Sequence, residues 1–166
     1  VYSTYDNQYN YLGMRGFGLP GDYNTRVLIT INGNRINNAT YDQGPTGRDF
    51  PLDVDLIERV EFIPGPGGAV YGQNAMLGVV NIITRTGADV KGTEVSASYQ
   101  TAEVMPQERV TLGKKFNNGL DALVSVSGLQ SRGTNHDMDF GDTGVSGVAR
   151  HMDEQNIKQL FARAAY

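Results

Sequence analysis

The second half of the chain alternates apolar and polar residues with a period of two over four long stretches. The stretches are 92–101, 108–116, 120–129 and 157–166. In the first of them Val95, Ala97 and Tyr99 would share one face, because successive side chains of a strand point to opposite faces. The sequence therefore predicts four strands with one apolar face each, although Leu123 breaks the alternation in the third.

The connections between these stretches differ in length. A medium turn at 102–106 is followed by a tight turn at 117–119, which contains Asn-Asn-Gly, and then by a long polar loop at 131–155. Alternating short turns and long loops between strands with one apolar face are typical of an outer-membrane barrel. A soluble antiparallel meander shows the same periodicity, so the pattern alone leaves both structures open.

The first half of the chain follows a different pattern, in which glycines cluster between β-branched runs. The runs at 26–33, 59–63 and 78–84 predict three strands of a compact sheet. Asn32-Gly33 is a tight-turn sequence that leads into a short further strand through Arg35 and Ile36. Residues 51–58, which open on a proline and carry two early aspartates, predict a short helix.

The composition and the short motifs of the chain speak against several classes of function. The net charge is −4 with no basic stripe, which speaks against nucleic-acid binding. The chain has no cysteine, so thiolate metal sites, cysteine nucleophiles and disulfides are excluded. Residues 16–21 match the GxGxxG pattern, but Pro20 and a turn follow where a dinucleotide site needs a helix. No catalytic triad or carboxylate pair stands out, so we expect no enzyme and no cofactor.

The long loop contains the strongest pattern for a metal ion, and this pattern is weak. Asn135, Asp137 and Asp139 alternate as oxygen ligands would in a calcium loop. The following glycine lies one place too late for an EF-hand, and no glutamate closes the loop. A solvated acidic loop explains the same residues, so no resident metal is expected.

Three segments of the first half resemble the plug domain of TonB-dependent outer-membrane receptors, among which are siderophore, haem and cobalamin receptors. They are Met14-Arg15-Gly16-Phe17-Gly18, the run 26–36, and the run 52–84, which contains Glu58-Arg59-Val60 and Tyr71-Gly72-Gln73-Asn74. They occur in the family's order and spacing over most of residues 12–86. The resemblance implies an α+β plug domain (a small mixed sheet with short helices) at 1–88. The first antiparallel strands of a transmembrane β-barrel of about 22 strands would follow at 89–166.

The resemblance also implies a function, active import of a scarce solute across the outer membrane of a Gram-negative bacterium. The solute would be a metal chelate, haem, cobalamin or a saccharide, and the plug would gate the barrel and help to bind it. The partners would be outer-membrane lipid and the TonB energy-transducing complex, whose contact segment is expected upstream of Val1. The alternative from another class is a free-standing β-rich module for ligand binding or adhesion at the cell surface.

Two sets of site residues follow from the resemblance. The loops 19–25 and 38–49 would lie at the plug apex, and loops held by a sheet often carry binding residues. The expected ligand contacts are Asp22, Tyr23, Asn24, Tyr41, Asp42, Gln43 and Arg48. The expected anchors between plug and barrel are Arg15, Glu58 and Arg59. Pro64 stands where the family usually has an arginine that serves as a second anchor.

Overall fold

The computed structural model describes most of the chain, namely residues 2–3, 10–14, 16–17, 21–101, 104–139, 141, 144, 146–151 and 154–166. The chain divides into two compact units, Val1–Arg85 and Thr86–Tyr166, slightly before the boundary predicted after residue 88. Each unit is described by itself. Among the described residues, no helix combines the length and the apolar character needed to cross a membrane.

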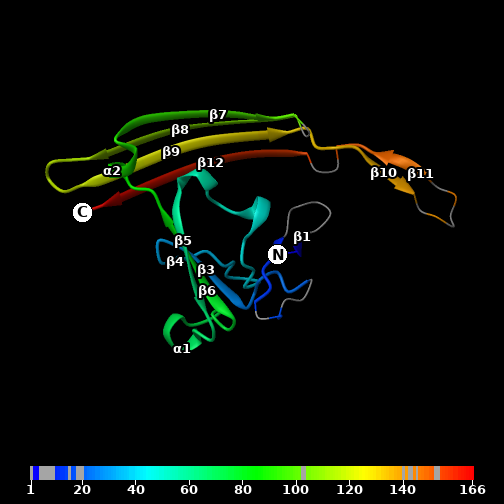
Figure 1. The fold of residues 1–166 in the computed structure, drawn as a ribbon, viewed down its shortest axis with the longest axis horizontal. Coiled ribbons are helices and arrows are strands. Elements are labelled where there is room, and N and C mark those ends of the chain that lie inside the picture. Colours follow the sequence, from blue (N-terminus) through cyan, green and yellow to red (C-terminus); the bar gives the residue numbers. More distant parts are fainter. Residues whose placement is uncertain are drawn as a thin grey trace. The chain divides into compact units, whose positions relative to one another are not determined.

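The first unit contains a mixed sheet of four strands in the order β4-β3-β6-β5 (Figure 1). The strands are β3 (Val27–Ile31), β4 (Asn34–Arg35), β5 (Ile57–Pro64) and β6 (Gly78–Thr84). β3 and β6 are parallel, and the other pairs are antiparallel. β1 (Tyr2–Ser3) and β2 (Asn10–Tyr11) form a separate pair. The predicted compact sheet and the turn at Asn32-Gly33 are confirmed.

The β-branched run of β3 forms the centre of this sheet because it is buried on both faces. Val27, Leu28 and Ile29 are all buried, as a strand with covered faces requires. Leu28 packs with Val79 of β6 and with Ala75 in the core. The sheet thereby gives rigid support to the loops at its ends.

The helix predicted at 51–58 is wrong. Only a single 3-10 turn forms, η2 (Val54–Leu56), with the Asp53 side chain accepting a hydrogen bond from Asp55 N at 3.0 Å. β5 begins directly afterwards, because the β-branched residues from Ile57 onward pair with β6. The unit has two further short elements, η1 (Gly47–Asp49) and α1 (Gly68–Tyr71).

The second unit contains an antiparallel sheet of four long strands in the order β12-β9-β8-β7 (Figure 1). The strands are β7 (Gly92–Gln100), β8 (Met105–Lys115), β9 (Asp121–Ser131) and β12 (Gln155–Ala165). All four match the strands predicted from the alternation. The polar stretch 131–155, predicted as a loop, contains a hairpin of β10 (His136–Asp139) and β11 (Ser146–Ala149).

A short helix that the sequence analysis missed, α2 (Gly87–Val90), opens the second unit. Thr86 and Asp89 form a capping box at its start. α2 lies against β8 at Gly113, where an added Cβ would come within 2.6 Å of Val90 Cβ. Leu123 of β9 lies directly across from Gly113 and is 1% exposed. The break in the alternation at Leu123 therefore marks the place where α2 covers the sheet.

Away from α2, the sheet of the second unit exposes its apolar side chains and buries its polar ones. Val95 and Leu160 are 72% and 74% exposed, whereas Thr111 and Ser125 are 0% and 2% exposed. By register, the apolar face carries Val95, Ala97, Tyr99, Val110, Leu112, Val124, Val126, Leu160 and Ala162. The polar face carries Glu94, Arg109, Thr111, Ser125, Ser127 and Gln159. This is the reverse of a sheet that packs in water.

Candidate functional site

Asn24 holds together the two loops predicted to bind ligand. Its side chain is buried at 5% exposure. Its Oδ1 accepts a hydrogen bond from Leu12 N at 2.8 Å, and its Nδ2 donates to Asn10 O at 2.9 Å. The same Nδ2 lies 3.2 Å from Gly44 O and 3.0 Å from Thr46 Oγ1. The amide is thus occupied inside the plug, and its role is to position the loops.

Asp42 ties the second loop to the segment that follows α1. Its Oδ1 accepts from Gln73 Nε2 at 2.7 Å and from the Arg35 guanidinium at 3.3 Å. Its backbone oxygen accepts from Asn37 Nδ2 and Asn74 Nδ2, both at 3.2 Å. Asp42 adopts a left-handed backbone with φ of 57°, which aspartate tolerates better than most residues. The carboxylate, which is partly exposed, therefore links the second loop to Arg35 and Gln73.

Gln73 and Asn74 belong to this site, although the sequence analysis did not assign them to it. Asn74 also donates to Thr25 O at 2.6 Å, so it reaches the first loop as well as the second. Both residues lie within the stretch 52–84 that carries the family resemblance. The clue in the sequence is the pair of amide residues directly after Gly72.

Two tyrosines are among the side chains that these loops present to solvent. Tyr41 is 74% exposed. Tyr23 is partly exposed, and its ring lies 6.0 Å from that of Tyr11 at an interplanar angle of 46°. Asp22 pairs with Arg26 at 3.4 Å. Tyrosines combine apolar area with a polar tip and few rotatable bonds, so Tyr41 and Tyr23 are the best-placed candidate contacts.

The two remaining predicted contacts lie on the second loop. Arg48 is part of η1 and is half-buried. Gln43 lines a hollow of about 400 Å³ together with Ile36, Asn38, Pro45, Asp49 and Pro51. The structure therefore brings 21–26, 42–46 and 73–74 together, with Tyr41 projecting beside them.

The predicted anchor residues Glu58 and Arg59 lie next to each other on β5 and form ion pairs along this strand. Arg59 pairs with Glu58 and with Glu61, each at 3.0 Å, and Glu61 also accepts from Asn81 Nδ2 at 2.9 Å. The hydrogen bond from Asn81, and then that from Arg59, hold the pKa of Glu61 below its usual range. The hydrogen bond to Glu61 raises the pKa of Arg59. Arg15, the third predicted anchor, lies outside the described residues.

The calcium candidates lie along an extended segment that includes β10. Asp137 and Asp139 both belong to β10, and Asp139 Oδ1 accepts from Gly141 N at 2.9 Å. In the described part of the chain, no group of three or more His, Cys, Asp or Glu residues is arranged to hold a metal ion.

The polar face of the second unit is cross-linked by side-chain hydrogen bonds. Arg109 pairs with Glu94 at 2.8 Å and donates to Thr111 Oγ1 at 2.8 Å. Thr111 in turn lies 2.8 Å from Ser125 Oγ. The guanidinium is buried, and a buried charge is stable only when it is paired and hydrogen-bonded. The network therefore lets the sheet keep its polar side chains covered and its apolar side chains exposed.

Comparison with known proteins identifies the first unit. Residues 1–79 match the family model of the TonB-dependent receptor plug domain. The siderophore receptor PiuA from Acinetobacter baumannii has a similar structure, with a TM-score of 0.51 and 20% identity, over 78% of this chain and 16% of that chain. The ferric enterobactin receptor PfeA from Pseudomonas aeruginosa, in a mutant form with enterobactin bound, gives a TM-score of 0.45 and 21% identity. That match covers 72% of this chain and 18% of that chain.

The chain spans less than one fifth of the length of these receptors. Its fold is that of a plug domain followed by partial barrel strands, as the alternation and the motifs predicted. Residues 1–79 match the plug domain of TonB-dependent receptors, and this match identifies the first unit as a plug domain.

Proposed function

We propose that the chain contributes the plug and the first barrel strands to an importer in the outer membrane of a Gram-negative bacterium. The TonB complex would pull on the plug from its N-terminal side, and the importer would take up a scarce solute. We propose a metal chelate, haem, cobalamin or a saccharide as the solute. The observation that carries this proposal is the exposed apolar face of the second unit.

The apolar face supports a membrane position for a physical reason. An antiparallel sheet in water stabilises itself by burying its apolar face, at about 25 cal/mol per Å². Here Val95, Leu112 and Leu160 are exposed, so that stabilisation is missing unless another apolar medium covers them. Barrel strands place such residues against hydrocarbon and turn their polar residues inward. A free-standing surface module would leave this face in water.

The plug supports a binding role through its converging loops. Asn24 fixes the loops from within, and Asp42 links the second loop to Gln73, so Tyr41 and Tyr23 would lose little conformational entropy when a solute binds. We propose these two tyrosines, with Asp22, Gln43 and Arg48 beside them, as the plug's contribution to the solute site. The loops of the remaining barrel would supply the other contacts.

A pair of lysine substitutions on neighbouring residues of β12 tests the membrane position. Leu160 lies on the apolar face and Gln159 on the polar face. In the full-length protein, Leu160→Lys should reduce the yield of assembled receptor, because a lysine facing mid-membrane lipid costs ~2–4 kcal/mol. Gln159→Lys keeps a polar side chain on the polar face and serves as the control. Equal yields of the two variants would place the apolar face in water and contradict the proposal.

A further inference from the structure

The chain contains two Asn-Gly pairs, Asn32-Gly33 and Asn118-Gly119. Both lie in tight turns between antiparallel strands, the first between β3 and β4 and the second between β8 and β9. In such a pair the side-chain amide of asparagine can react with the backbone nitrogen of the next residue, because glycine has no side chain to obstruct the attack. The structure places the two asparagines in different surroundings.

The side chain of Asn32 is held on a neighbouring strand. Its Nδ2 donates a hydrogen bond to Thr84 Oγ1 at 2.8 Å, and its Oδ1 accepts one from Thr84 N at 3.0 Å. Thr84 is buried in β6. The nitrogen of Gly33 donates to Asn81 Oδ1 at 3.1 Å. Residues of β6 thus bind both groups that would have to react with each other, so this pair is protected.

The side chain of Asn118 folds back over its own turn instead. Its Oδ1 accepts a hydrogen bond from Leu120 N at 3.1 Å, so the side chain curves over Gly119, the residue between them. Asn118 and Gly119 are both exposed. The nitrogen of Gly119 donates to Phe116 O at 3.1 Å, and a bond of this kind in an exposed turn opens at little cost in free energy. The turn therefore keeps the side-chain amide beside the nitrogen that would attack it.

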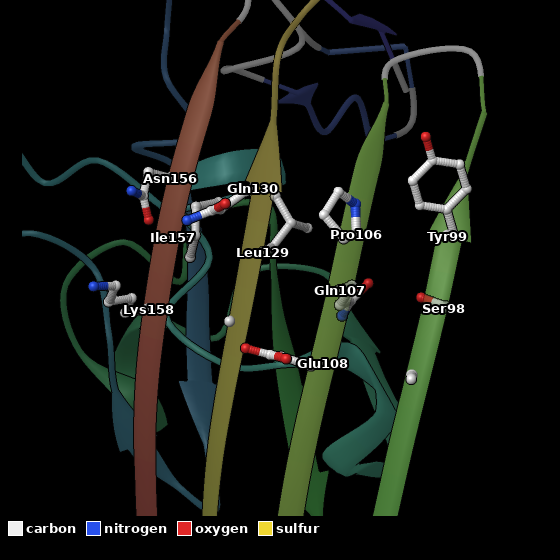
Figure 2. Close-up of a pocket in the computed structure, with 12 residues that line it drawn as sticks. Ser98, Tyr99, Pro106, Gln107, Glu108, Leu129, Gln130, Asn156, Ile157 and Lys158 are labelled. Atoms are coloured by element: carbon white, nitrogen blue, oxygen red, sulfur yellow. The ribbon is translucent and has the colours of Figure 1, made fainter.

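The hairpin on which this turn lies is long and regular. β8 and β9 pair without a register shift from Gln107 and Leu129, at the end drawn in Figure 2, to Lys115 and Asp121 beside the turn. Strand pairing on both sides of the turn restricts its backbone to one arrangement. Reacting groups that are held in position react faster than groups that meet by chance, so the ordered turn favours reaction at Asn118.

We propose that Asn118 is a site of spontaneous deamidation in the folded protein. The nitrogen of Gly119 attacks the side-chain carbonyl carbon of Asn118 and forms a cyclic succinimide. The bond from that carbon to Nδ2 breaks, and the leaving nitrogen takes up the proton of the Gly119 amide and departs as ammonia. Water then opens the ring at either carbonyl, which gives aspartate or isoaspartate at position 118. The Leu120 amide assists, because it donates to the oxygen on which negative charge develops.

The reaction would change the turn in charge and in shape. A carboxylate replaces a neutral amide in the same hairpin as Lys114 and Lys115. In the isoaspartate product the backbone runs through the former side chain and gains a methylene group. The hydrogen bond from Phe116 N to Leu120 O, now 2.7 Å long, closes the hairpin, and the longer backbone should break it. Deamidation would thereby loosen this end of the hairpin.

The test follows the two Asn-Gly pairs by peptide mass spectrometry while the purified full-length protein is incubated at mildly alkaline pH. In the folded protein Asn118 should deamidate roughly tenfold faster than Asn32 or more, because misplacement of reacting groups by ~1 Å can cost ~10²-fold in rate. In protein unfolded by urea the two pairs should react at similar rates. A protease that cleaves before aspartate but not before isoaspartate separates the two products. The inference does not depend on the proposed function.

Two variants identify the reacting groups. Asn118→Gln keeps an amide but lengthens the side chain, and it should stop the reaction at this position. Gly119→Asn should slow deamidation of Asn118 roughly tenfold, because a side chain at position 119 obstructs the attack. Asparagine tolerates the positive φ of 94° at this position, and an added Cβ would meet Tyr166 Cε2 at 3.9 Å. The turn should therefore keep its fold in this variant.

Equal rates at Asn32 and Asn118 in the folded protein would overturn the proposal. It would also be overturned if Asn118 stayed intact under conditions in which the unfolded chain reacts. An unchanged rate in Gly119→Asn would show that the nitrogen of Gly119 is not the attacking group. Hydrogen exchange of the isoaspartate form checks the structural consequence, since retained protection of the Phe116 amide would contradict the loosening of the hairpin.

Discussion

Asp121 holds the start of α2 with both oxygens of its carboxylate. Its Oδ1 accepts a hydrogen bond from Gly87 N at 2.6 Å, and its Oδ2 accepts one from Ala88 N at 2.9 Å. The first amides of a helix have no partner within the helix, and a carboxylate there also meets the positive end of the helix dipole. Asp121 thus fastens the segment that opens the second unit to the beginning of β9.

Replacing Asp121 by alanine should release this attachment. Hydrogen bonds to a charged group contribute ~1.5–3 kcal/mol to stability, so the amides of Gly87 and Ala88 should exchange with solvent about tenfold faster or more. Hydrogen exchange of the full-length protein measures this directly. Asp139→Ala is the matched control, because it removes one carboxylate-to-amide bond from the distant β10–β11 hairpin. Unchanged protection at Gly87 and Ala88 would show that Asp121 does not carry the attachment.

The close approach of α2 to the sheet predicts that two glycines cannot be replaced. A Cβ added to Gly87 would lie 2.2 Å from Ala122 O, and one added to Gly113 would lie 2.6 Å from Val90 Cβ. Overpacking of this kind costs ~1–3 kcal/mol. Gly87→Ala and Gly113→Ala should therefore each reduce the yield of folded, protease-resistant receptor. Gly147→Ala, where nothing lies within 4 Å of the added Cβ, should assemble like the wild type, and a full yield for Gly113→Ala would contradict the packing of α2.

Substitution of an exposed residue and of a buried residue in the plug loops should have different effects, the first on solute binding and the second on stability. Tyr41→Ala should weaken solute binding by ~1–4 kcal/mol and leave the plug folded, because the side chain is exposed. Asn24→Ala should instead destabilise the plug by ~1–3 kcal/mol, because it leaves buried backbone groups without partners. Whole-cell binding and hydrogen exchange of the plug would separate the two effects.

The control for the plug loops is Asn118→Ala, in the tight turn of the second unit, which should change neither quantity. If Tyr41→Ala binds solute like the wild type, the solute is held by barrel loops that follow residue 166. If Asn24→Ala leaves the protection of the plug amides unchanged, Asn24 does not position the loops.

The lowered pKa of Glu61 predicts that the stability of the plug sheet depends on pH. Its pKa is lowered in the folded plug by hydrogen bonds from Asn81 and Arg59, so the unfolded plug binds the proton more readily. The resulting stability is present above the ordinary glutamate pKa of ~4.3 and is lost as the pH falls through the lower folded value. Hydrogen exchange of the β5–β6 amides over this pH range measures it. Glu61→Gln should flatten the dependence, and equal slopes in both proteins would rule out this role for Glu61.

The sequence predicted the elements whose patterns are local. β7, β8, β9 and β12 follow from alternation, and β3 follows from a β-branched run with a turn after it. It did not predict the attachment of α2 to β9 or the supporting role of Asp42, because both depend on contacts between residues far apart in the chain. Asp121 meets Gly87 across 34 positions, and Asp42 meets Gln73 across 31. Composition also could not show that Asn24 points into the plug.

The most direct test of the importer is the sidedness of the two ends of the barrel strands. Short turns of such barrels face the periplasm and long loops face the outside, so Asn118 should be periplasmic and Asp137 external. The test uses a full-length protein without other cysteines, in which one cysteine is introduced at position 118 or at position 137. Intact cells that carry each variant are treated with a maleimide that does not cross the membrane. The account predicts that Asp137→Cys is labelled and that Asn118→Cys is labelled only after the outer membrane is permeabilised. Labelling of Asn118→Cys but not of Asp137→Cys on intact cells would contradict it.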